Sequence, residues 1–118
     1  MKTLYPFKFE PILKDKIWGG QKLQQLLHKS TTSAEAGESW EISDVEGDTS
    51  VVANGALKGT SLKTLMDTYT SDLMGAKNFN QFGTKFPLLI KFIDAKQDLS
   101  VQLHPNDELA KARHNSFG

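Results

Sequence analysis

The stretch DLSVQLHPND, residues 98–107, alternates apolar and polar side chains in the way that is typical of a half-buried strand. Successive side chains of a strand point to opposite faces, so its leucine and valine residues share one face. The other face carries a hydroxyl, an amide and an imidazole, which belong to Ser100, Gln102 and His104. This segment therefore predicts a sheet with one apolar face and one chemically functional face.

The polar face of this strand could hold a metal ion. Gln102 and His104 stand two residues apart, so both side chains can reach one point. Imidazole is a common ligand of transition metals, and a neutral amide oxygen leaves the charge of the ion undiminished. Pro105 has no N–H group and ends the ladder just beyond His104, at the mouth of the sheet. The alternative is that these polar side chains simply face solvent on an antiparallel sheet.

Length and composition predict one domain, residues 1–118, and exclude several classes of function. The chain has 14 basic and 14 acidic residues, and this balance argues against a nucleic-acid partner or an anionic membrane surface. It has no cysteine, which excludes disulfides and thiolate metal sites. No apolar run reaches membrane-spanning length and the N-terminus lacks the apolar region of a signal peptide, so we expect a cytoplasmic protein.

Hydrophobic periodicity and turn residues predict a mainly β fold with short helices. The expected strands and meander of short strands cover residues 4–20 at a sheet edge, 38–44, 45–59, 86–95 as a buried strand, and the opening stretch. The expected helices cover residues 21–28, 60–69 and 107–113. Residues 30–37 and 77–85 are expected to be loops.

Lys91 is unusual because it interrupts an otherwise apolar run, FPLLIKFIDA. It is either a functional group or a lysine whose stem lies on the strand while its charge reaches the surface. The strongest strands also lie near the end of the chain with nothing after them to pair against. We therefore expect the front part of a longer protein.

Three segments resemble the type I phosphomannose isomerases. FPLLIKFIDAKQDLSVQLHPND is similar to the buried lysine-bearing strand and the Gln-x-His-Pro strand of that family. KIWGG is similar to its Trp-Gly element, and GESWEIS to its Glu-x-Trp strand. The matches keep their order from residue 16 to residue 107. The element KIWGG departs from many relatives at Ile17, where they have an acidic residue.

The resemblance implies an incomplete cupin-type jelly roll and a zinc-dependent enzyme that interconverts mannose 6-phosphate and fructose 6-phosphate. The implied zinc ligands are Gln102 and His104, with one zinc ion per full-length chain. The implied contacts to the sugar phosphate are Ser100, Lys91, Glu38 and Trp18. Zinc would stabilise the oxyanion that develops as a proton moves between C1 and C2. The sequence contains no convincing catalytic base.

The family's remaining ligands and phosphate-binding groups have no counterpart before residue 118. We therefore expect the isolated chain to be inactive, to hold zinc poorly and to self-associate through uncovered strands. Two other classes stay open at this point. One is a non-catalytic cupin-type module with a sugar-phosphate-binding or regulatory role. The other is a purely structural domain.

Overall fold

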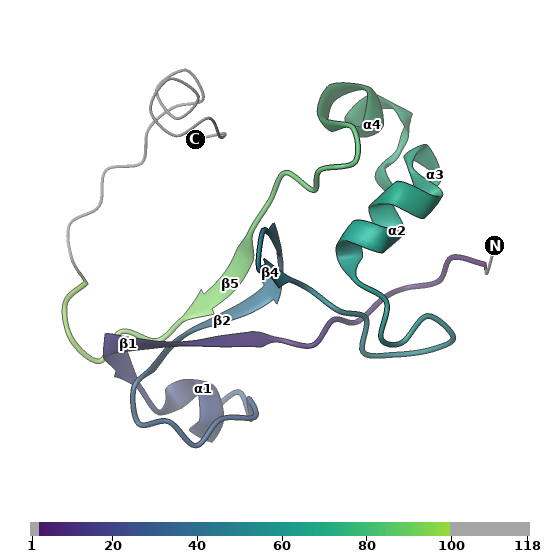
Figure 1. The fold of residues 1–118 in the computed structure, drawn as a ribbon. Coiled ribbons are helices and arrows are strands. Elements are labelled where there is room, and N and C mark those ends of the chain that lie inside the picture. The colour runs from purple at the N-terminus through teal and green to yellow at the C-terminus, as the bar shows by residue number, and fades with distance from the viewer. Residues whose placement is uncertain (1–2, 100–118) are drawn as a thin grey trace.

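The computed structural model describes residues 3–99, and its centre is a three-stranded antiparallel sheet with the order β1-β2-β5 (Figure 1). A two-stranded hairpin and short helices accompany the sheet. The strands are β1 (Ile12–Gly20), β2 (Ala36–Ile42), β3 (Asp44–Val45), β4 (Asp48–Thr49) and β5 (Ile90–Ile93). The helices are α1 (Lys22–Gln25), α2 (Leu62–Tyr69), α3 (Ser71–Met74) and α4 (Ala76–Phe82). The predicted class, a sheet with short helices, is confirmed.

The end of β1 packs closely against the beginning of β2 because two glycines leave room for the backbone. A Cβ atom on Gly19 would lie 2.6 Å from the backbone nitrogen of Gly37 and in contact with the carbonyl oxygen of Glu35. A Cβ atom on Gly37 would lie 2.8 Å from the ring of Trp18. The Trp-Gly element therefore has a structural role: the glycine allows the two backbones to approach, and the indole of Trp18 is buried where the strands meet.

Helices α2 to α4 lie at one end of the molecule and α1 lies at the other (Figure 1). Helix α2 begins at the N-cap Ser61, whose hydroxyl accepts a hydrogen bond from the backbone N–H of Thr64. One face of α2 packs on the extended N-terminal segment. The core cluster there consists of Val52, Leu65 and Tyr69, with Leu4, Phe7, Phe9, Leu57 and Leu73 packed against it. The helix expected over residues 60–69 from the spacing of its apolar residues is confirmed as α2.

The expectation that residues 77–85 form a loop is wrong, because most of them belong to α4. Gly75 and Gly83, at the two ends of this helix, have φ values of 82° and 64°. The side-chain amide of Asn78 donates a hydrogen bond to the carbonyl of Met74, the last residue of α3. The apolar spacing of this stretch is weak. Its helix is delimited instead by glycines that adopt backbone conformations unfavourable to other residues.

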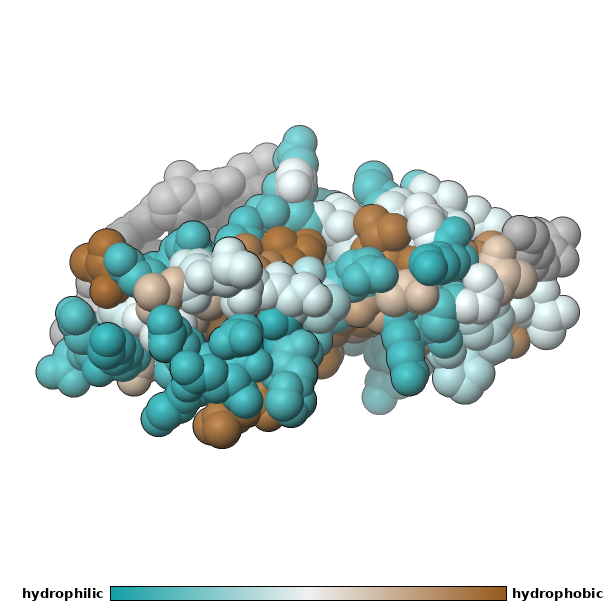
Figure 2. Space-filling view, turned by 90° about the horizontal axis from the view of Figure 1, so that it is seen from below, coloured by the Kyte–Doolittle hydropathy of each residue, from teal (hydrophilic) through white to brown (hydrophobic). Residues whose placement is uncertain are grey.

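Strand β5 forms where the apolar run predicted a strand, but the prediction that it is buried is wrong. All four of its residues are exposed, and Ile90, Phe92 and Ile93 each keep about half of their accessible surface (50%, 50% and 51%). Within the described residues β5 lies at the edge of the sheet, with a partner on one side only. Figure 2 shows the molecule from below, where hydrophobic residues form separate patches among hydrophilic ones.

Part of the sequence-based prediction lies outside the described residues. This part comprises most of the opening strand, with Ser100, Gln102 and His104, and the helix expected at residues 107–113. Among the described residues, no helix is long and apolar enough to cross a membrane.

Candidate functional site

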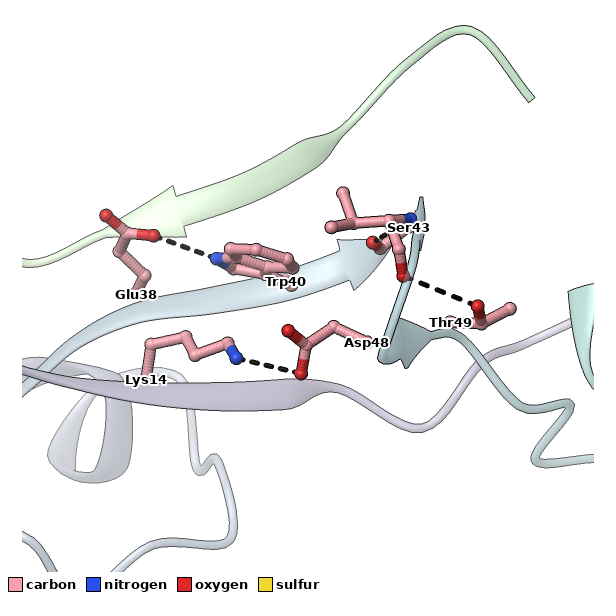
Figure 3. Close-up of polar contacts among 7 residues, drawn as sticks. Lys14, Glu38, Trp40, Ser43, Asp48 and Thr49 are labelled. Carbon is pink, nitrogen blue, oxygen red and sulfur yellow. Dashed lines mark hydrogen bonds and ion pairs between the residues drawn. The ribbon is translucent and has the colours of Figure 1, made fainter. Parts of the chain in front are cut away.

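Strand β2 carries a carboxylate and an indole on the same face. Glu38 and Trp40 are two residues apart, and the Nε1–H of Trp40 donates a hydrogen bond of 2.8 Å to Oε1 of Glu38 (Figure 3). The residue Glu38 is only 7% exposed. Its carboxylate is therefore held close to the strand rather than extended into solvent.

Strand β5 adds a lysine to this face. In the antiparallel register Trp40 lies opposite Lys91, and Glu38 lies opposite Ile93. The Nζ atom of Lys91 reaches diagonally to Oε1 of Glu38, at 3.1 Å. It also lies 5.7 Å from the centre of the Trp40 ring. The charge that interrupts the apolar run is therefore paired with a buried carboxylate, while the lysine side chain itself stays 31% exposed.

Strand β1 completes the arrangement from the other side of β2. Lys14 Nζ lies 4.8 Å from the centre of the Trp40 ring and 2.8 Å from a carboxylate oxygen of Asp48 (Figure 3). We call Lys14, Glu38, Trp40 and Lys91 the β2 cluster. Its indole is approached by one cation from each neighbouring strand.

Burial and the neighbouring donors and charges act on the pKa of Glu38 in opposite directions, and the net pKa is lowered. Burial alone raises the pKa of this carboxyl, because it disfavours the charged form. The hydrogen bonds from Trp40 and Lys91 and the positive charges of Lys91 and Lys16 outweigh the burial, so the net pKa lies below the ordinary value of 4.5. Glu38 is an anion at neutral pH, suited to accept hydrogen bonds from a ligand's hydroxyl groups.

Trp18 lies close to the β2 cluster without bonding to it. Its ring packs on Gly37, the residue before Glu38. Its carbonyl accepts hydrogen bonds from the backbone N–H groups of Lys96 (2.7 Å) and Gln97 (3.2 Å). The chain that leads toward Ser100 therefore runs beside Trp18.

A second lysine–glutamate pair lies on the opposite face of β2. Glu41 accepts a hydrogen bond of 2.8 Å from the hydroxyl of Ser39 and forms an ion pair of 2.9 Å with Lys29. Lys29 lies 5.6 Å from the centre of the Phe92 ring. This pair repeats the chemistry of the β2 cluster with a phenyl ring, which has no N–H to donate. It provides a natural control for experiments on Glu38.

Of the predicted site residues that the structure describes, Glu38 and Lys91 are in direct contact and Trp18 is a near neighbour. Ser100, Gln102 and His104 lie outside the described residues. Within residues 3–99, no group of three or more His, Cys, Asp and Glu side chains is arranged to hold a metal ion. Lys14 and the role of Trp40 were not predicted from the sequence. The spacing of Glu38 and Trp40, two residues apart on one strand, was the available signal for the indole–carboxylate contact.

Comparisons with known proteins agree on one family. Residues 6–117 match the family model of the catalytic domain of type I phosphomannose isomerase. The mannose-6-phosphate isomerase ManA of Bacillus subtilis is 41% identical over 96% of this chain. A mannose-6-phosphate isomerase of Streptococcus mutans is 35% identical over 96% of the chain.

A solved structure gives the same result for the fold. The mannose 6-phosphate isomerase of Bacillus subtilis superposes with a TM-score of 0.82 and 36% identity, over 93% of this chain. That match covers 33% of the solved chain, and the matches to the two curated relatives cover 34% of each. The present chain therefore spans about a third of the length of these relatives.

Proposed function

The chain belongs to the type I phosphomannose isomerase family, and from this premise we propose that it is the N-terminal portion of an aldose–ketose isomerase that interconverts mannose 6-phosphate and fructose 6-phosphate. The relatives named mannose-6-phosphate isomerase support the reaction. The β2 cluster is the observation that supports a sugar site in this part of the chain. Its buried, ionised carboxylate is held beside an ammonium group on one face of the sheet.

In the proposed site Glu38 accepts hydrogen bonds from sugar hydroxyl groups and Lys91 contributes positive charge near the anionic substrate. Trp18 lines the same region, and Ser100 contacts the phosphate. Holding the phosphate lets remote binding energy position C1 and C2 for proton transfer.

Zinc is the proposed cofactor, with Gln102 and His104 as two of its ligands. An imidazole and an amide are neutral donors of a kind that suits a Lewis-acidic zinc ion, although catalytic zinc commonly takes about three protein ligands. The described residues offer no competing cluster. When bound, the ion would supply electrostatic stabilisation to oxygens of the reacting sugar.

We further propose a cupin-type jelly roll for the whole domain and inactivity for the 118 residues alone. The structural match with a TM-score of 0.82 supports the fold, and the short span relative to the curated relatives supports the inactivity. The exposed apolar side chains of β5 support self-association of the isolated chain, since an edge strand with apolar side chains readily pairs with another strand.

The experiment is an isomerase assay on the natural gene product that carries this sequence, before and after dialysis against a chelator. We expect turnover of mannose 6-phosphate that is lost on chelation and restored by zinc. Binding of mannose 6-phosphate without turnover in the zinc-loaded protein would instead indicate a non-catalytic sugar-phosphate module. In parallel, the 118-residue chain should show neither turnover nor one retained zinc ion per chain, and robust activity with retained zinc would contradict its proposed inactivity.

A further inference from the structure

The two oxygens of the Glu38 carboxylate have different surroundings. Oε1 accepts two hydrogen bonds, from Trp40 Nε1 at 2.8 Å and from Lys91 Nζ at 3.1 Å. Among the described residues, none hydrogen-bonds to Oε2. Figure 3 shows this second oxygen directed away from the Trp40 indole. The described residues therefore anchor the carboxylate through one oxygen and give no hydrogen bond to the other.

The indole that anchors Glu38 is itself held from two sides. Lys14 from β1 and Lys91 from β5 lie 4.8 Å and 5.7 Å from the ring centre, both within the range of cation–π attraction. Lys14 is in turn fixed by its ion pair with Asp48. An indole has one donor and no acceptor, so the position of Trp40 Nε1–H determines where a carboxylate can bond to it.

We propose that Trp40 is a positioning residue: its indole, held between Lys14 and Lys91, fixes Oε1 of Glu38 and so aims Oε2 at a hydroxyl of the bound sugar phosphate. The inference rests on the proposed function for the identity of the ligand. The anchoring of Glu38 by Trp40 can be tested without any substrate. A merely structural tryptophan would need its ring but not its N–H.

The opposite face of β2 supplies the contrast. Lys29 and Glu41 form an ion pair beside the Phe92 ring, and there the second donor to the carboxylate is the hydroxyl of Ser39. Ser39→Ala therefore removes one neutral donor to a glutamate from the same strand. It is a matched control for Trp40→Phe, which keeps an aromatic ring and removes the N–H.

The experiment measures the titration of the Glu38 side-chain carboxyl by carbon-13 NMR in the natural gene product, together with kcat and KM for mannose 6-phosphate across pH. In Trp40→Phe we expect the Glu38 pKa to rise, because a hydrogen bond to the charged form is lost while burial remains. We expect kcat/KM to fall about tenfold, the effect of losing one hydrogen bond to a charged group. Ser39→Ala should change neither the Glu38 titration nor kcat/KM.

A measurement on the unaltered protein covers the case in which Trp40→Phe does not fold. The indole N–H resonance of Trp40 should shift with pH as Glu38 titrates, and Glu38→Gln should abolish that shift. The proposal would be overturned if the indole N–H resonance did not shift as the Glu38 carboxyl titrates. It would also be overturned if Trp40→Phe had the same Glu38 titration and the same kcat/KM as Ser39→Ala. Absence of isomerase activity in the unaltered protein would count against the proposed function alone, since the NMR titration needs no turnover.

Discussion

The ammonium group of Lys91 lies 3.1 Å from Oε1 of Glu38, although 53 positions separate the two residues in the sequence. Antiparallel pairing of β2 with β5 brings them onto one face. The side chain of Glu38 is 9% exposed and that of Lys91 is 31% exposed, so water screens the pair only in part. A carboxylate at this depth needs such partners to stay ionised.

The first prediction concerns stability at low pH. The pKa of Glu38 is lower in the folded protein than the ordinary value of 4.5, so the ionised group favours the folded state above that value. This contribution should disappear as the pH falls from 4.5 through the lowered pKa. The urea midpoint of unfolding should therefore depend less on pH in Glu38→Gln than in the unaltered protein between pH 5 and about pH 2.5. Equal slopes in the two proteins would contradict the prediction.

The second prediction concerns the close packing of the end of β1 against the beginning of β2. Gly19→Ala should destabilise the protein by about 2–3 kcal/mol, because the new methyl group meets backbone atoms of Glu35 and Gly37 that cannot rotate away. Gly47→Ala is the control: its Cβ meets no atom within 4 Å, but its φ of 85° carries a cost of about 1 kcal/mol. Chemical denaturation measures both, and a smaller loss for Gly19→Ala than for Gly47→Ala would refute the packing argument.

The third prediction concerns Thr70, between α2 and α3. Its φ is 48° and its ψ is −119°, a combination that is strained for a β-branched residue. Thr70→Gly should raise the unfolding free energy by about 1 kcal/mol, the strain relieved less the entropy cost of glycine. Thr68→Gly, at an exposed position within α2, should lower the unfolding free energy by about 0.3 kcal/mol, the difference in helix propensity between the two residues. Destabilisation by both substitutions would show that Thr70 is not strained.

The fourth prediction concerns self-association of the 118-residue chain. Ile90 lies in the edge strand β5 and is 50% exposed, so Ile90→Lys should reduce association measured by sedimentation, because a charge on an edge strand opposes pairing. Val45 is 42% exposed but belongs to the separate β3–β4 hairpin, and Val45→Lys is the control. A monomeric unaltered chain, or equal effects of the two lysines, would exclude β5 as the associating edge.

Local sequence signals predicted much of the fold. The capping serine and the leucine spacing of α2, and the alternation in β2, each report a property of one segment. The prediction for residues 77–85 failed because α4 has no apolar stripe at helical spacing, and its ends are set by Gly75 and Gly83. The burial of β5 could not be judged from its apolar residues, because burial depends on which other segments cover the strand.

The sequence also predicted part of the candidate site, but not the contacts between its residues. The charge of Lys91 within an apolar strand marked it as unusual, but its partner depends on the register between β2 and β5, which no local pattern specifies. The contribution of Lys14 depends likewise on the pairing of β1 with β2. Gln102 and His104 remain predictions, because they lie outside the described residues.

The central claim is that Glu38 binds the sugar phosphate and that Glu41, on the other face of β2, does not. The most direct measurement compares kcat/KM for mannose 6-phosphate in Glu38→Gln and Glu41→Gln variants of the natural gene product. We predict that Glu38→Gln lowers kcat/KM by about tenfold to a hundredfold, because a charged hydrogen-bond acceptor is lost, and that Glu41→Gln stays within about twofold of the unaltered protein. Equal activity of the two variants, with both folded, would contradict the account.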